Sequence, residues 1–513
     1  MDEWELAPLH ERFAHSTLSL SALFAQFNEY RQFFPNLIFV VAGYVSKGDL
    51  RLVMYITFVI ACLISYNVYK LSETTLHVSP GQRWWLFAAA NVLIFSPVPV
   101  ENWLQGQQLI YFVPAVVLTT CLRIAYGQNS RPYSKLLLCG LLCLVSTFSS
   151  ANGFICWLLM APLLIHGTAW STLRPKSAFV GGWLIALALC LAVYLTGYQK
   201  PATHPALTHI LAHQIDDLIY FVSLLGRPFA FGRILVSIAM GALLLVLFIW
   251  AVSAYLRRLN SENLCWLILG AYSLATAFLI MIGRAGLGLT HSLTTRYATF
   301  TLFLPVALVY LFKAGNTSRA AIVALLLIVV HIPLYIFGVR NMRALRAEDL
   351  YGKACVHFIN VIDHDNCQTQ VFPDRAKLRA FANSLDRLGY LRPSLATSAS
   401  MHDLTATNAS AAEDYGSFVE LKLTGLSEYT ASGVARLPQR HRPADAVLLA
   451  CEDVSHDARV FGVARMSGND YARWSKTFNL ELLPAATCNV TAWAFDAGSR
   501  KAFRLSGAQT VAK

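Results

Sequence analysis

Residues Asn28–Pro35 read NEYRQFFP, which sets a carboxylate and an arginine among aromatic side chains directly before the first apolar stretch of the chain. Asp2-Glu3-Trp4 lies close upstream. Apolar residues recur at roughly helical spacing from Thr17 to Phe34. This pattern predicts an interfacial helix, which lies on a membrane surface and does not cross it.

The composition is that of a membrane protein with a more polar tail. Of the 513 residues, 56% are hydrophobic and only 14% are charged, and the mean hydropathy is +0.49. Charged residues are largely absent from a series of apolar runs that ends near Phe337. The net charge of +12 is explained by basic loops that stay in the cytoplasm, so we expect no nucleic-acid partner.

We predict an α-helical transmembrane domain over residues 49–339, because its apolar runs have about the length that a bilayer core requires. Ten helices are expected, at 52–70, 83–100, 107–124, 136–150, 154–168, 178–197, 231–256, 263–283, 297–313 and 319–338. The fourth and fifth are short and share the turn Ser150-Ala151-Asn152-Gly153. These two helices could instead form a hairpin that dips into the membrane.

Basic residues in the predicted loops indicate the orientation. Eleven lie in the loops on one side of the membrane and five lie in the opposite short loops and helix ends. The positive-inside rule makes the first set cytoplasmic, so ten crossings put residues 1–48 at the outer face of a bacterial cytoplasmic membrane and make the tail extracytoplasmic. Residues 1–48 have no basic region ahead of an apolar core, as a signal peptide would. Their export without a preceding span is uncommon, so we expect a further helix upstream of Met1.

The tail changes character along its length. Residues 340–395 are amphipathic and predict helices, whereas residues 396–412 are rich in Ser, Thr and Ala and predict a linker. Short alternating apolar runs over residues 413–513 predict a small β-sandwich.

Four cysteines lie in this tail. Cys451 and Cys488 fall on or beside two predicted strands of one domain, and we expect a disulfide between them. Cys355 and Cys367 are a second, weaker candidate pair. Four cysteines allow three connectivities, and four free thiols remain the alternative.

Polar residues crowd the loops that we place on the outer side. Hydration of helix ends and anchoring by aromatic residues explain about half of them. Charged and amide side chains near a bilayer are costly, so their gathering on one face suggests a functional site. The candidate binding residues are Arg31, Glu101, Gln105, Gln107, Asn152, Arg284, Arg296 and Tyr297.

Several of these stretches resemble a known family. They are Asp2-Glu3-Trp4, Asn28-Glu29-Tyr30-Arg31, Phe34-Pro35, Asn102-Trp103 through Gly106-Gln107, Ser150-Ala151-Asn152-Gly153 and Thr295-Arg296-Tyr297. Together they resemble bacterial polytopic glycosyltransferases of the GT-C type, over residues 1–340. The resemblance implies a polyprenyl-phosphate-linked sugar as donor and a catalytic acid in the first outer loop, which here is Asp2 or Glu3. This chain departs from the family because it lacks the helix that precedes that acid.

Transfer of a sugar with inversion needs two kinds of group. A carboxylate takes the proton of the acceptor, and Glu29 competes with Asp2 and Glu3 for this role. Cations stabilise the departing lipid phosphate, for which the planar fork of arginine is suited. Arg296 is the strongest candidate, followed by Arg284 and Arg31, although Arg31 could equally be an interfacial side chain.

His204, His209 and His213 follow one another at spacings of five and four residues. Such a series can bind a metal, but no cysteine or acid completes a ligand set at a recognised spacing. A solvated loop is the better interpretation, and we expect neither a metal nor a cofactor.

We therefore expect a membrane glycosyltransferase that moves a sugar from a polyprenyl-phosphate donor to a cell-envelope glycan or lipid acceptor. A lipid or glycan transporter, or flippase, is the main alternative, and it would show an internal repeat and charges at mid-membrane. A non-catalytic assembly protein, whose tail binds a glycan or a partner, is the third.

Overall fold

The computed structural model describes residues 2–127, 131–166, 175–201, 204–205, 212–257, 261–315, 317–362, 366–405, 415–438, 442–452, 457–467 and 472–513. The chain forms two compact units. The helical unit comprises Leu18–Ala42 and Leu50–Met342, and the barrel unit comprises Met1–Thr17, Gly43–Asp49 and Arg343–Lys513.

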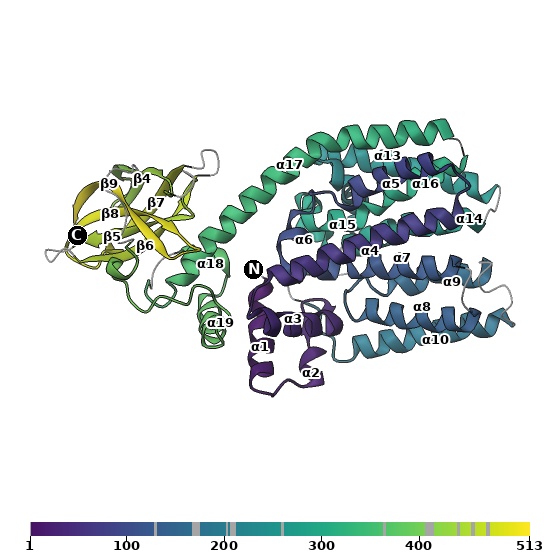
Figure 1. Cartoon of the computed structure of the whole chain (residues 1–513), viewed down its shortest axis with the longest axis horizontal. Helices are drawn as coiled ribbons and strands as arrows, with labels where there is room; N and C mark the ends of the chain where they lie inside the picture. Colours follow the sequence, from purple (N-terminus) through teal and green to yellow (C-terminus); the bar gives the residue numbers. More distant parts are fainter. Residues whose placement is uncertain are drawn as a thin grey trace. The chain divides into compact units, whose positions relative to one another are not determined.

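The helical unit contains most of the helices labelled in Figure 1. Its helices are α2 (Leu20–Leu23), α3 (Phe33–Ser46, shared with the barrel unit), α4 (Arg51–Thr75), α5 (Pro80–Ile94), α6 (Val100–Leu104), α7 (Val113–Tyr126), α8 (Pro132–Thr147), α9 (Ile155–His166), α10 (Lys176–Leu195), α12 (Gln214–Gly226), α13 (Ile234–Leu256), α14 (Ser261–Arg284), α15 (Ala298–Thr301), α16 (Phe303–Gly315) and the shared α17 (Thr317–His357). Short 3-10 helices lie between them, namely η2 (Gly106–Tyr111), η4 (Arg227–Phe229), η5 (Ala285–Leu287), η6 (Leu289–Leu293) and η7 (Thr295–Tyr297).

Within the described residues, seven helical segments are long and apolar enough to cross a membrane, which is the architecture of a multi-pass membrane protein. They are Arg51–Thr75, Gly106–Tyr126, Lys176–Leu195, Ile234–Leu256, Asn263–Leu287, Thr295–Phe312 and Leu325–His357.

The prediction of ten full spans is not confirmed. Helices α5, α8 and α9 have 15, 16 and 12 residues. At 1.5 Å per residue each is shorter than the roughly 30 Å of a bilayer core. The apolar runs predicted at 83–100 and 136–150 continue past the ends of α5 and α8 into the turns that follow these two helices.

The predicted interfacial helix between Thr17 and Phe34 is wrong. Helix α2 has only four residues, and a hairpin of two two-residue strands follows it, β1 (Gln26–Phe27) and β2 (Tyr30–Arg31). The aromatic rings of Phe24 and Phe33 stack on each other with centroids 4.4 Å apart. Helical spacing of apolar residues therefore reflects packing between the ends of a turn, and not a continuous helical face.

Polar contacts and close backbone approaches join the helices of this unit. The Asn67 amide on α4 donates to the Thr120 hydroxyl on α7 at 2.8 Å, and the Ser65 hydroxyl donates to Asn91 on α5 at 2.6 Å. Gly226 and Gly241 lie where α12 meets α13, and a Cβ at either position would overlap the facing backbone. Small residues and interhelical hydrogen bonds of this kind hold helices together in a bilayer.

The prediction of a β-sandwich is also wrong, because the C-terminal strands close into a barrel. Its strands are β3 (Gly416–Leu423), β4 (Glu428–Ala435), β5 (Ala446–Glu452), β6 (Ala458–Met466), β7 (Arg473–Asn479), β8 (Thr487–Asp496) and β9 (Lys501–Ala512), coloured green to yellow in Figure 1. Their order is β3-β4-β7-β6-β5-β8-β9.

Closure of the barrel depends on how its outer strands meet. Strand β3 pairs in parallel with β9, with Ser417 opposite Ser506. The register shifts within the β3–β4, β5–β6 and β8–β9 pairs, and such irregularities bend a sheet. Alternating apolar residues predict a buried face, but they do not show whether the two edges of a sheet join.

Helices and the N-terminal segment pack within the barrel unit. Helix α18 (Cys367–Val371) and helix α19 (Arg375–Arg387) follow α17. The N-terminal η1 (Asp2–Leu6) and α1 (Ala7–Ala14) contact α19, and Trp4 joins a cluster that contains Leu378. In the predicted linker, Ala396, Met401 and Leu404 are buried in an apolar cluster with the barrel strands, and residues 406–412 lie outside the described residues.

Both predicted disulfides are confirmed. Cys451 pairs with Cys488 and Cys355 pairs with Cys367, with Cα–Cα distances of 5.3 and 5.9 Å. The first links β5 to β8, two neighbouring strands of the barrel. The second links the end of α17 to α18.

We expect replacement of both Cys451 and Cys488 by serine to lower the free energy of unfolding of the barrel by about 2–4 kcal/mol, because the unfolded chain loses a cross-link. Pulse proteolysis in urea of the detergent-solubilised chain, followed through a C-terminal tag, measures this change. Cys62→Ser is the matched control, since Cys62 is a free, exposed cysteine of α4. Equal urea midpoints for the double variant and the unaltered chain would contradict the prediction.

Candidate functional site

The β1–β2 hairpin presents Glu29 at its tip. Gln26 lies opposite Arg31 and Phe27 lies opposite Tyr30, so Asn28 and Glu29 form the turn. Asn28 has a φ of 51°, a left-handed conformation that asparagine tolerates better than most residues. This explains how the NEYR stretch folds locally.

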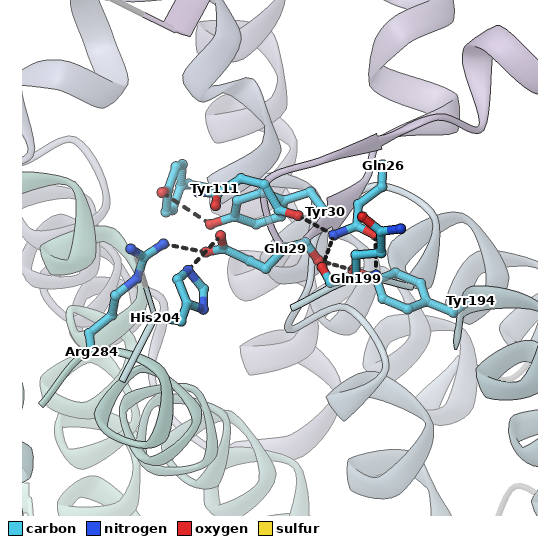
Figure 2. Close-up of polar contacts among 9 residues, drawn as sticks. Gln26, Glu29, Tyr30, Tyr111, Tyr194, Gln199, His204 and Arg284 are labelled. Carbon is cyan, nitrogen blue, oxygen red and sulfur yellow. Dashed lines mark hydrogen bonds and ion pairs between the residues drawn. The ribbon is translucent and has the colours of Figure 1, made fainter. Parts of the chain in front are cut away.

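The C-terminal end of α10 and the segment after it hold the hairpin in place (Figure 2). The Gln26 side-chain amide donates to the Gln199 carbonyl at 2.6 Å, and the Gln199 N–H donates back to the Gln26 amide oxygen at 2.9 Å. The Tyr194 hydroxyl donates to the Glu29 carbonyl at 2.6 Å. Glu29 is therefore fixed by residues far away in the sequence.

The Arg31 guanidinium also holds this arrangement. It donates to the carbonyls of Phe24 at 2.9 Å and Tyr194 at 2.6 Å, and to that of Thr196. Helix α10 ends at Leu195, so two of these carbonyls belong to its C-terminal end, where carbonyls lack partners within the helix and cations are favourable. We therefore assign Arg31 a positioning role in place of the expected phosphate contact.

The Glu29 carboxylate has a basic group beside each of its oxygens. Arg284, the last residue of α14, donates from Nη2 to Oε1 at 2.7 Å. His204 places Nε2 at 3.3 Å from Oε2, although the two buried atoms do not make an aligned hydrogen bond. The three side chains are only 9–17% exposed. Figure 2 shows Arg284 and His204 both directed at the Glu29 carboxylate.

The surroundings of the histidine in this group favour its neutral form. Burial lowers the pKa of His204, and the charge of Arg284 lowers it further, while Glu29 acts in the opposite direction. His213, by contrast, is exposed and lies 3.8 Å from Asp216. His209 lies outside the described residues. No group of three or more His, Cys, Asp or Glu suited to a metal occurs in the part of the chain that the structure describes.

A second carboxylate, Glu101 on α6, lies beside two arginines. Its Oε1 accepts a hydrogen bond from the Thr295 hydroxyl at 2.6 Å, and its Oε2 lies 3.9 Å from Nη1 of Arg296. Burial lowers the pKa of Arg227 to about 10, against the opposing charge of Glu101. Asn102 fixes the same segment, because its amide donates to the Arg296 carbonyl at 2.8 Å.

Aromatic residues and a histidine connect the two carboxylates. The Tyr30 hydroxyl lies 3.4 Å from that of Tyr111. Burial, followed by the ionisable neighbours Tyr111, Glu29 and Tyr297, raises the pKa of Tyr30 well above its ordinary value. Burial lowers the pKa of His291, and both Arg284 and Arg296 lower it further. These shared neighbours place the two carboxylate–arginine pairs in one polar cluster.

The remaining predicted residues divide into three groups. Gln105 accepts from Gln108 at 3.2 Å, and Gln107 is buried on η2 close to the cluster in sequence. Asn152 is bonded to Ser150 at 2.6 Å and to Thr276 at 3.4 Å, so it stabilises a turn. Asp2 and Glu3 belong to the barrel unit, whereas the residues of the cluster all belong to the helical unit.

Sequence reasoning missed several members of this cluster. They are Tyr30, Tyr111, Tyr194, Arg227 and His291. The prediction that His204 lies in a solvated loop is wrong, because its side chain is only 9% exposed and faces Glu29. In the sequence the tyrosines are indistinguishable from interfacial anchors, and Arg227 is indistinguishable from a loop charge that sets topology. Only the tertiary fold brings them together.

Comparisons with protein families, with curated proteins and with solved structures gave no match to this chain. The cluster must therefore be interpreted from its own chemistry.

We expect Arg31→Lys to destabilise the helical unit by about 1–3 kcal/mol, since one ammonium cannot reach three carbonyls that a guanidinium fork satisfies. Thermal unfolding of the detergent-solubilised chain measures this loss. Arg233→Lys is the control, because Arg233 is exposed and its replacement leaves these contacts intact. Equal unfolding temperatures for the two variants would show that the clamp is not stabilising.

Proposed function

We propose that this chain is a membrane glycosyltransferase that moves a sugar from a polyprenyl-phosphate donor to a cell-envelope glycan or lipid acceptor. The observation that carries the proposal is the pairing of buried Glu29 with Arg284 inside a cluster that also contains Arg296. A carboxylate and two arginines are the groups that a transfer from a lipid phosphate requires.

Glu29 is the general base in this proposal. Its Oε2 is buried and accepts no hydrogen bond from a described residue, so it can take the proton of an acceptor hydroxyl. The acceptor oxygen then forms a bond to the anomeric carbon of the sugar. At the same carbon the bond to the phosphate oxygen breaks, and the lipid phosphate leaves with the electron pair.

Arg284 and Arg296 stabilise the negative charge that develops on the departing phosphate. Arginine binds phosphate oxygens through two parallel hydrogen bonds, which fix orientation as well as charge. The ion pair with Glu29 holds Arg284 in place, and Glu101 orients Arg296 from 3.9 Å. Preorganised donors of this kind stabilise a transition state without reorganising.

The proposed location is the outer face of a bacterial cytoplasmic membrane, with the barrel unit outside the cytoplasm. Two disulfides in the barrel unit support this location, because disulfides persist in oxidising compartments and are rare in the cytosol. The excess of basic residues in the loops of the opposite side supports the same orientation.

A transporter or flippase is the second candidate, and a polar path through the bilayer would favour it. One cavity of the helical unit is lined by apolar side chains and a single threonine, namely Ile64, Ile94, Phe112, Thr299, Leu302, Phe303 and Val306. This lining has no charged side chain, so the cavity does not provide the polar path that transport of a charged headgroup requires.

We expect Glu29→Gln to reduce sugar transfer by about 10²–10⁴-fold, because an amide cannot accept the proton. The assay follows radiolabelled sugar from a polyprenyl-phosphate donor in membranes that contain the protein. Glu73→Gln is the matched control, since Glu73 pairs with Lys70 on α4 and lies outside the cluster. Unchanged transfer by Glu29→Gln would remove the proposed base.

We expect Arg296→Ala to reduce transfer by about 10²–10³-fold, which corresponds to about 2.7–4 kcal/mol for one lost donor. Arg296→Lys should recover little, because a point charge lacks the fork. Steady-state kinetics in the same membranes measure both variants, with Arg233→Lys as the control. Full activity of Arg296→Lys would show that charge alone matters at this position.

A further inference from the structure

His204 is the neighbour of Glu29 that the proposed reaction does not yet use. Its Nε2 lies 3.3 Å from the Glu29 Oε2. Both atoms are buried, and neither has an aligned hydrogen bond among the described residues. Figure 2 shows the imidazole pointing at the carboxylate from the side opposite the Tyr30 ring. A proton between these two atoms would satisfy both.

The surroundings of His204 favour the neutral imidazole, so the protonated ring releases its proton easily. The charged groups that face it are Glu29 on the hairpin, Arg284 at the end of α14 and Lys200 on its own loop. Burial and the two cations lower its pKa, and only Glu29 raises it. At pH 7 the ring therefore has a nitrogen that can accept a proton, and the imidazolium that results is a strong enough acid to pass the proton on.

We propose that His204 is a proton relay and positioning residue that acts through Glu29. The inference rests on the proposed function. Glu29 takes the proton of the acceptor hydroxyl, and His204 then takes that proton from Glu29 Oε2 and releases it to water. The relay restores the carboxylate before the next turnover, and no oxidant, reductant or further reactant is needed.

Arg284 explains why a relay is useful at this position. Its guanidinium, 2.7 Å from Oε1, stabilises the ionised carboxylate. The protonated form of Glu29 is therefore disfavoured and tends to release its proton. The Glu29 and Arg284 side chains are about one-sixth exposed and the His204 side chain is 9% exposed. His204 is the titratable group beside the second oxygen of Glu29, so it is the nearest acceptor for the proton that Glu29 releases.

The test is chemical rescue of His204→Gly by imidazole in the transfer assay. We expect a kcat about 10–100-fold below that of the unaltered chain, with the KM for the polyprenyl-phosphate donor unchanged, because proton transfer is slowed and phosphate binding is not. Added imidazole should restore kcat in proportion to its unprotonated form, so rescue should increase with pH. A merely structural histidine would show no such rescue.

Two controls accompany this variant. His213→Gly removes a histidine that is exposed beside Asp216 and should leave kcat unchanged. His204→Asn retains a polar side chain of similar reach but cannot carry the proton, so it should fold, bind donor normally and show the lowered kcat. This second variant keeps the proposal testable if the glycine substitution prevents folding.

The outcomes separate the relay from the proposed function. Normal kcat in both His204 variants, or a loss in folded His204→Gly that imidazole does not restore, would overturn the relay while leaving Glu29 as the base. Absence of sugar transfer by the unaltered chain would contradict the proposed function, and the relay with it.

Discussion

A carboxylate inside an apolar helix bundle must be paired, because burying a lone charge costs several kcal/mol. The Glu29–Arg284 ion pair meets this constraint, and the surrounding fold is arranged to bring its two members together. Glu29 lies in the turn of a hairpin of two short strands near the N-terminus, whereas Arg284 ends a helix 255 residues later. The contacts that place the hairpin are consequently as important to the site as the charges themselves.

Those contacts are made mostly by the end of α10 and the residues that follow it. Arg31 donates to carbonyls that the helix leaves without partners. The Gln26 side-chain amide makes two hydrogen bonds to the Gln199 backbone, one as donor and one as acceptor. The result is a fixed position for the Glu29 carboxylate, which the proposed proton transfer from a bound hydroxyl needs. Tyr194 completes the support through the Glu29 carbonyl.

Sequence reasoning identified the broad class of this fold and many residues of the site. Hydropathy predicted a multi-pass membrane protein, and strand positions predicted the Cys451–Cys488 pairing. The closed barrel was missed because the alternation of apolar residues along a strand does not show whether the two edge strands of a sheet pair with each other. The hairpin was missed because the spacing of Phe24, Phe27 and Phe34 also fits a helix. Glu29, Arg284 and Arg296 were candidates because of their residue types and their place in the predicted outer loops, and only tertiary contacts show which of them share partners.

The resemblance to GT-C enzymes led to Asp2 or Glu3 as the expected catalytic acid. In the structure, Glu29 is a carboxylate that is buried and paired with an arginine. The proposed chemistry is the same, but the role of base moves to a residue in the NEYR stretch. Asp2 and Glu3 belong instead to the barrel unit, in a segment that packs on α19. The candidate site is therefore defined by contacts within the helical unit.

The most direct measurement of the central claim is a cryo-electron microscopy structure of the full chain with a non-transferable phosphonate analogue of a polyprenyl-phosphate sugar. We expect the phosphonate within hydrogen-bonding distance of the Arg284 or Arg296 guanidinium, with the anomeric carbon close to Glu29. Density for the phosphonate away from both arginines, with the Glu29–Arg284 pair undisturbed and only solvent beside it, would contradict the proposed role of this cluster.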